Sequence, residues 1–183
     1  MKKSVGFKLA LLSAVLLAMP VAHAATMSKA DYESTKTRIK ADYKSDKAAC
    51  DSQSGNAKDI CSEEGKAKEK VAMAELEYGY SGKAADYNKV LVAKAESNYT
   101  VAKERCDNLA GNPKDVCVEK AKAAEVTALA DAKLGEQIGE ARKDAASDKR
   151  DADYKVAIEK CNALAGDAKS SCIASAKMTY GKT

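Results

Sequence analysis

The chain has no tryptophan, one phenylalanine, one histidine and two prolines among its 183 residues. Both Phe7 and His23 lie in the first 24 residues. The remaining chain therefore has no imidazole, which excludes Ser-His and Cys-His nucleophile pairs, histidine general bases and histidine metal ligands from it. It also has no phosphate-binding loop, calcium loop or nucleophile elbow. We predict that the protein is not an enzyme and that it binds no cofactor.

Large apolar side chains are also sparse. Hydrophobic residues make up 45% of the chain, but alanine supplies much of this fraction. A thick globular core is therefore not expected. Abundant Ala, Lys, Glu and Asp with so few prolines favours long helices whose contact faces are narrow and rich in alanine. Disorder is the alternative that the 32% of charged residues leaves open, and the cysteine pattern described below argues against it.

The N-terminus has the three regions of a secretory signal peptide. Lys2 and Lys3 precede an apolar run over residues 9–19, and the small-residue pattern of residues 22–24 follows. The run is shorter than the roughly 20 apolar residues that a helix needs to cross a membrane. We predict that residues 1–24 are a signal peptide, cleaved after Ala24, and that the exported protein resides in the periplasm.

Removal of this segment changes the charge of the protein. Lys2, Lys3 and Lys8 leave with no acidic residue to balance them, so the formal net charge falls from +4 to +1. What remains is nearly neutral, with both signs finely mixed along the chain. Nucleic acid is therefore not an expected partner.

The six cysteines reveal an internal repeat. The pattern Tyr-x6-Cys-x4-Gly-x5-Cys occurs over residues 43–61, 99–117 and 154–172, and successive copies begin 56 and 55 residues apart. That period suits a unit of two helices and a connection. The tyrosine precedes its cysteine by seven residues, which places Tyr43, Tyr99 and Tyr154 on the same helical stripe as the sulfur, in the seam between helices.

Each repeat contains the residues of a tight turn between two helices. A glycine that would end the first helix in a left-handed conformation is followed at once by a residue that would cap the second: Gly55 with Asn56, Gly111 with Asn112, and Gly166 with Asp167. Pro113 occupies the first position of its helix, where the missing N–H costs nothing.

In each repeat, the turn places the two cysteines opposite each other in the antiparallel helix pair. We therefore predict three local disulfides, Cys50 with Cys61, Cys106 with Cys117, and Cys161 with Cys172. The alternative is a metal site built from thiolates, but there is no Cys-x2-Cys motif and no histidine to complete it. A redox-active pair would also show closer spacing. No metal site is expected.

These features predict an all-α protein of three antiparallel helical hairpins, each stapled by one disulfide, either elongated or loosely bundled. The hairpins are assigned to residues 25–80, 81–135 and 136–183, and the last helix is short. Ser28 is expected to cap the first helix. Only Gly135 and Gly139 interrupt the chain after Asn112, and each costs about 1 kcal/mol relative to alanine. One continuous helix is therefore possible up to about Ala165.

The composition and the repeated frame, from Tyr43 to Cys172, resemble Gram-negative periplasmic proteins labelled TolA-like or cell-envelope biogenesis proteins. TolA itself has a transmembrane anchor and a globular end, and the chain departs from both, so energy transfer across the envelope is not implied. The resemblance implies a structural, interaction or stress-related role with envelope proteins as partners. A metal binder, a small-ligand binder and a chaperone-like holdase are the alternatives.

Overall fold

The computed structural model describes residues 27–182, which contain five helices and no strand. In chain order the helices are α1 (Lys29–Cys50), α2 (Gly55–Ser81), α3 (Ala84–Cys106), α4 (Asn112–Asn162) and α5 (Gly166–Tyr180). The all-α prediction is confirmed. The predicted signal peptide lies outside the described residues.

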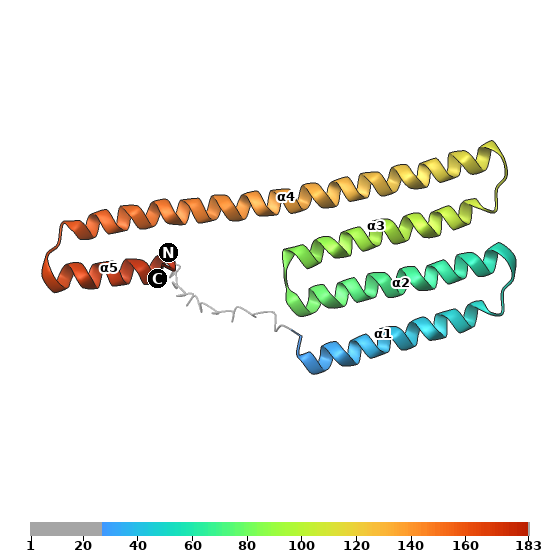
Figure 1. The fold of residues 1–183 in the computed structure, drawn as a ribbon, viewed down its shortest axis with the longest axis horizontal. Coiled ribbons are helices and arrows are strands. Elements are labelled where there is room, and N and C mark those ends of the chain that lie inside the picture. The colour runs from blue at the N-terminus through green and yellow to red at the C-terminus, as the bar shows by residue number, and fades with distance from the viewer. Residues whose placement is uncertain (1–26, 183) are drawn as a thin grey trace, which may run out of the picture.

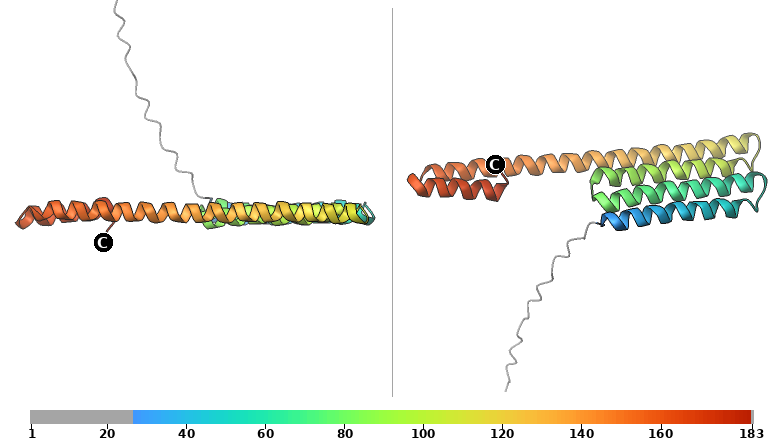
Figure 2. Two further views of the ribbon diagram at one scale, coloured as in Figure 1. Left: turned by 90° about the horizontal axis from the view of Figure 1, so that it is seen from above. Right: turned by 60° about the horizontal axis from the view of Figure 1, so that its bottom comes forward.

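The helices lie side by side in a layer that is one helix thick (Figures 1 and 2). α1 to α4 run up and down in sequence order, and α5 packs on the far part of α4, beyond the start of α3. Within residues 27–182 each helix contacts only its neighbours in the chain, so α1 touches α2 but neither α3 nor α4. Of the two shapes that the sequence left open, the elongated one is therefore observed.

A layer of this kind buries little. The buried hydrophobic residues are Ile39, Cys50, Leu76, Val90, Ala93, Ala95, Cys106, Ala132, Cys161 and Ala176. Most of them are alanine or cysteine, because a helix in a single layer buries only the narrow stripes that face its neighbours. The sparse large apolar residues of the sequence match this architecture. Across residues 27–182, no helix combines the length and the apolar content needed to cross a membrane.

The helix limits follow local signals in the sequence. Ser28 is the N-cap of α1, and its Oγ accepts a hydrogen bond from the Asp31 backbone N–H at 3.1 Å, as predicted. α2 ends at Gly82, whose φ of 62° is left-handed and whose N–H donates to the Tyr78 carbonyl at 2.8 Å. This residue closes the first hairpin and lets α3 turn back along α2.

α4 is a single helix of 51 residues, about 77 Å long at 1.5 Å per residue. Gly135 and Gly139 are both inside it, so the continuous helix was predicted correctly, although it ends at Asn162 and not near Ala165. The predicted boundary between residues 135 and 136 falls within α4, and the second and third hairpins share this helix. Residues 133–150 are all exposed, because α3 and α5 cover the two ends of α4 and leave this stretch uncovered.

The turn glycines have the left-handed conformation that was predicted, with φ of 57°, 58° and 55° at Gly55, Gly111 and Gly166. Their position relative to the helices was predicted wrongly. The first helix of each pair ends at Cys50, Cys106 or Asn162, several residues earlier. The glycine instead begins the second helix, because its carbonyl accepts the first helical hydrogen bonds: the Gly111 carbonyl accepts from the N–H groups of Lys114 and Asp115.

The residues after these glycines are therefore not N-caps, as had been predicted. Asn56 and Asp167 are the second residues of α2 and α5, Asn112 is the first residue of α4, and none of the three helix starts has a side-chain capping hydrogen bond. Pro113 is in the first turn of α4, where proline is tolerated. The shift frees the Asn56 amide to donate to the Glu104 carbonyl of α3, 3.2 Å away.

Candidate functional site

Three disulfides close the turns with nearly identical geometry. Cys50 joins Cys61, Cys106 joins Cys117 and Cys161 joins Cys172, with Cα to Cα distances of 5.6, 5.7 and 5.6 Å. All three pairings were predicted. The first cysteine of each pair is 1% exposed. Each bond therefore fixes the end of a hairpin from inside the seam, and such disulfides are typical of an oxidising, extracytoplasmic compartment.

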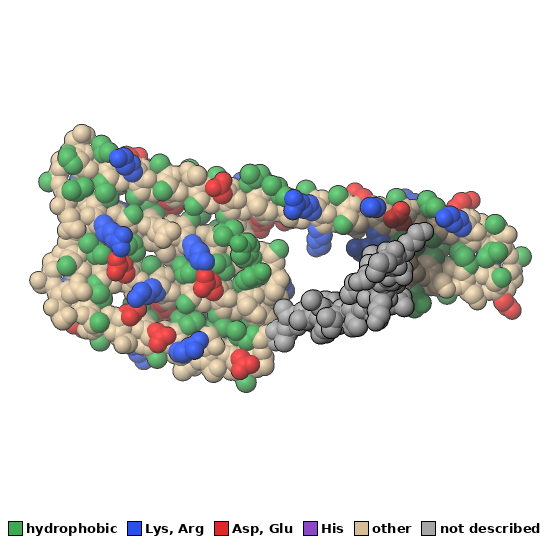
Figure 3. All heavy atoms as spheres, turned by 180° about the vertical axis from the view of Figure 1, so that it is seen from behind, with side chains coloured by type: hydrophobic (Ala, Val, Ile, Leu, Met, Phe, Trp, Pro, Cys, Tyr) green, Lys and Arg blue, Asp and Glu red, His purple; other side chains and the backbone are tan. Residues whose placement is uncertain are grey.

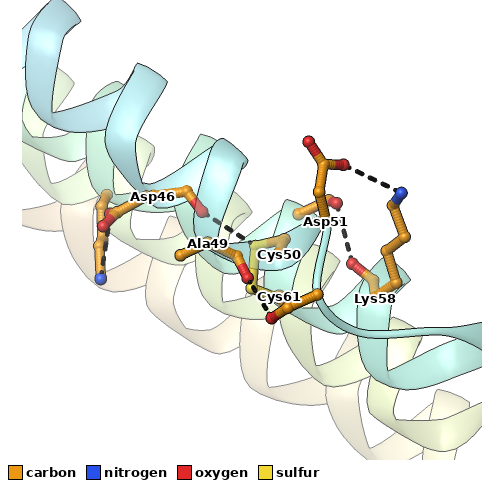
Figure 4. The surroundings of a disulfide bond; sticks show 9 residues. Asp46, Ala49, Cys50, Asp51, Lys58 and Cys61 are labelled. Atoms are coloured by element: carbon orange, nitrogen blue, oxygen red, sulfur yellow. Dashed lines mark hydrogen bonds and ion pairs between the residues drawn. A yellow bond between two sulfur atoms is a disulfide. The ribbon is translucent and has the colours of Figure 1, made fainter.

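Figure 4 shows the first of these turns. The disulfide ties the last turn of α1 to the first turns of α2, and outside it Lys58 forms an ion pair with Asp51 at 3.0 Å. Lys114 and Asp107 repeat this ion pair at 3.0 Å in the second turn. All six cysteine sulfurs form disulfide bonds, so none is available as a thiolate ligand for a metal. Residues 27–182 contain no cluster of three or more metal-ligating side chains.

Two of the repeat tyrosines, Tyr43 and Tyr154, pack against the neighbouring helix, as the spacing predicted. The Tyr43 ring lies against α2, where Gly65 leaves room for it. Tyr154 contacts Tyr180 of α5 with ring centroids 6.2 Å apart. Tyr43, Tyr99 and Tyr154 are all half-buried. These contacts hold neighbouring helices together.

On the two broad faces of the layer, charged side chains of both signs lie among hydrophobic ones. Ion pairs cross the seams between helices: Lys68 with Asp46, Lys70 with Glu96, Lys94 with Glu75, Arg105 with Glu64, and Lys182 with Asp151. In Figure 3, Lys and Arg side chains lie next to Asp and Glu side chains over the four-helix part, with hydrophobic side chains between them. Each exposed pair contributes little stability, at most about 1 kcal/mol. Together the pairs fix a nearly neutral pattern of alternating charge on the surface.

Two carboxylates that bind residues near helix ends are held in their charged form. The Lys182 ammonium donates a hydrogen bond to Asp151 at 2.5 Å, which lowers the pKa of that carboxyl. Asp86, at the start of α3, accepts hydrogen bonds from Lys89 and from the Ser81 hydroxyl, and its pKa is lowered mainly by Lys89. Neither group lies in an enclosed cleft, so both serve to fasten helix ends.

A hollow lies where the start of α3 meets α4. It has a volume of about 480 Å³ and is open to solvent. Tyr87, Leu91 and Ala132 supply an apolar lining, and Gly135 and Gly139 leave the α4 backbone uncovered. Asn88 donates to Glu136 at 2.8 Å, while its own carbonyl oxygen is buried without a hydrogen-bond partner. The hollow suits a side chain of a partner better than an enclosed ligand.

No protein family matches this chain. Neither the curated proteins nor the solved structures include a significant match to it. Its function therefore has to be argued from the residues and their arrangement.

The disulfides and the turn glycines were predicted from the sequence, but the contacts that join one hairpin to the next were not. Asn56 was interpreted as a cap, and its contact with α3 was not foreseen. Lys94 and Glu75 were not paired in advance, although their side chains are 2.7 Å apart. A signal for them exists: when the repeats are aligned, Arg38 and Asp131 stand at the equivalent positions with the same signs of charge.

Proposed function

We propose that this protein is an exported, non-catalytic component of the cell envelope that binds other envelope proteins through the flat faces of its helical layer. The carrying observation is the layer itself, which presents two broad faces of α1 to α4 to the solvent. A protein that sequesters a substrate needs a concave site. A single layer offers area instead, and repeated hairpins multiply similar surfaces that a partner can engage at several points.

The disulfides support this function because they keep the faces in a fixed relation without a thick core. A closed loop of about a dozen residues stabilises the fold by about 3 kcal/mol in the chain-entropy model. Three such loops are a large contribution for a protein with ten buried hydrophobic residues among those described. A rigid surface also loses less conformational entropy when it binds.

The periplasm is the compartment that we propose, with cleavage of the signal peptide after Ala24. The signal pattern of residues 1–24 and three disulfides in one chain support it. The mass of the protein purified from the periplasmic fraction tests cleavage directly. A full-length species retained in the membrane would contradict the proposal.

Site-specific photo-crosslinking in living cells tests the binding function. Lys89 and Asn98 of α3 are both exposed and nine residues apart, which places them on opposite faces of the layer. A photo-reactive residue placed at Lys89 or at Asn98 should capture envelope proteins from at least one of the two faces. A probe on the same face of α2 should capture the same proteins. The buried Ala93 is the matched control and should capture nothing.

Two results would overturn the proposed function. One is the absence of crosslinked envelope proteins from both faces. The other is a conservative substitution such as Tyr99→Phe that abolishes the cellular phenotype of the protein while leaving folding and crosslinking intact, since that would reveal a specific chemical site.

A further inference from the structure

The layer has two free edges, and they are formed by α1 and by the first half of α4. Among the helices of residues 27–182, α1 packs only on α2, and α4 packs only on α3 along this stretch. In the middle of the layer, α2 and α3 instead each have a neighbour on both sides. The outer sides of α1 and α4 are therefore equivalent to sides that are covered elsewhere in the same molecule.

The repeat identifies these equivalent positions residue by residue. The first two copies begin 56 residues apart, so α1 corresponds to α3 and α2 corresponds to the first half of α4. Val90, Ala93 and Ser97 of α3 are buried. Helical spacing from Lys94 and Glu104, which contact α2, places them on the α2–α3 seam, where one hairpin packs on the next. Their equivalents on α1 are small side chains, all exposed: Ser34, Thr37 and Ala41.

The other half of the seam is a stripe on α2. Asn56 and Tyr78 both contact α3, Tyr78 through the Tyr87 ring at a centroid distance of 5.1 Å. Helical spacing places Ile60, Ala67, Val71 and Ala74 on the stripe between them. The equivalent stripe on α4 is apolar and exposed, and it consists of Val116, Ala123, Thr127, Ala130 and Leu134. Val116 is 43% exposed and Leu134 is 54% exposed.

Two of the polar contacts across the α2–α3 seam have matching residues at the free edges. Asn56 donates to the Glu104 carbonyl, and the equivalents are Asn112 and the Ala48 carbonyl. The Lys94–Glu75 ion pair has Arg38 and Asp131 as its equivalents, with the same signs of charge. Both of these side chains are exposed, and neither forms an ion pair within residues 27–182.

Three other contacts are not reproduced. The Tyr78–Tyr87 ring contact is replaced by Leu134 and Asp31. The Lys70–Glu96 pair is replaced by Val126 and Lys40, and the Arg105–Glu64 pair by Ala49 and Lys120. A contact between the free edges therefore keeps part of the α2–α3 seam, and we expect it to be weaker and reversible.

We propose that the protein associates with itself edge to edge, the α4 edge of one copy packing on the α1 edge of the next in the manner of the α2–α3 seam. α1 runs in the same direction as α3, so a second copy placed by translation continues the antiparallel order of helices (Figure 1). The two surfaces differ from each other, which makes the contact heterologous, and such contacts form open rows when the rotation does not close. This association does not depend on the proposed function.

Sedimentation of the purified protein over a range of concentrations tests the proposal. The weight-average mass should rise with concentration beyond that of a dimer. Ala130→Glu on the α4 edge and Ala41→Glu on the α1 edge should each keep the protein monomeric. The matched control is Ala124→Glu, because Ala124 is exposed but lies about 120° around α4 from Ala130 and projects from a face. Unchanged helicity and three intact disulfides show that each variant folds.

Mixing the two edge variants distinguishes a head-to-tail contact from a symmetric one. The Ala130→Glu protein keeps its α1 edge and the Ala41→Glu protein keeps its α4 edge, so an equimolar mixture should form dimers and nothing larger. The charge-reversed variants Arg38→Glu and Asp131→Arg should each associate at least several-fold more weakly alone. Mixing them should restore association into rows in which the two variants alternate, because each edge then meets an edge of opposite charge. A protein that is monomeric at every concentration overturns the proposal, as does an Ala41→Glu variant that still dimerises alone.

Discussion

The Tyr32 hydroxyl, at the start of α1, donates a hydrogen bond to the Glu77 carboxylate, near the end of α2. The Tyr32 ring also contacts Tyr80, with centroids 4.8 Å apart. These contacts close the open end of the first hairpin, opposite the end that the Cys50–Cys61 disulfide holds. The two helices of this hairpin are thus joined by a disulfide at the turn and by an exposed hydrogen bond at the open end.

This hydrogen bond gives a pH prediction. It is the main cause that raises the pKa of Tyr32 from 10.0 to about 12. A raised tyrosine pKa means that the fold favours the neutral phenol, so the contribution to stability is complete below pH 10 and is lost as the pH rises from about 10 to 12. Glu77→Gln should return the pKa of Tyr32 toward 10, as followed by NMR of its ring carbons. An unchanged titration in this variant would show that Glu77 does not hold the phenol.

The third staple should be essential to α5 alone. α5 has 15 residues, and within the described part of the chain it packs only on α4. Helices of this length are marginal in water without tertiary contacts. Replacing both Cys161 and Cys172 by serine should remove amide hydrogen-exchange protection from residues 166–180 while leaving α1 to α3 protected. Loss of protection in α1 would show that the far hairpin stabilises the whole layer.

Removing the second staple should have a global effect instead. The Cys106–Cys117 bond joins α3 to α4, and so connects the α1–α3 part of the layer to the helix on which α5 packs. Changing both cysteines to serine should lower the free energy of unfolding by about 3 kcal/mol, because the unfolded chain regains the entropy of an open loop. Urea unfolding followed by circular dichroism measures the loss. A change below about 1 kcal/mol would contradict the entropic argument.

Replacing glycine by alanine should have opposite effects on stability in the long helix and in the turns. A Cβ at Gly135, Gly139 or Gly111 would meet nothing within 4 Å, but only Gly111 has a left-handed φ, of 58°. Gly135→Ala and Gly139→Ala should each raise the free energy of unfolding by about 0.5–1 kcal/mol, since alanine favours the helix. Gly111→Ala should lower it by about 1 kcal/mol or more. Thermal unfolding of the three variants checks the signs, and a stabilising Gly111→Ala would be inconsistent with this turn.

Asn56 and Asn112 are a matched pair for testing the contact between hairpins. The Asn56 amide donates to the Glu104 carbonyl, so Asn56→Ala should cost about 1 kcal/mol of stability. Asn112 has the equivalent position in α4, where the layer ends, and Asn112→Ala should leave the stability of the dilute protein nearly unchanged. Chemical unfolding at low protein concentration measures both. Equal losses would mean that the side chain acts within its own helix start.

Much of the local structure could be read from the sequence because it depends on residues close together in the chain. The spacing of Cys50, Gly55 and Cys61 is enough to specify a stapled turn, and it recurs twice more. α4 is continuous because two isolated glycines cost less than its other residues contribute to helix formation. Asn56 was misassigned for the same local reason, since an asparagine after a glycine also suits a cap, and its real partner lies 48 residues away.

The helices, the three disulfides and the repeat could be predicted from the sequence, since each follows from local conformational preference and short loop closure. Two features arise from contacts between helices: the hairpins lie in one layer, and α5 packs in line with α3 and not beside the outer edge of α4. Alanine-rich stripes on both sides of a helix are compatible with a bundle as well as with a layer. Whether a bundle or a layer forms depends on which stripes meet across the seams. Specific pairs such as Lys94 with Glu75 favour the layer.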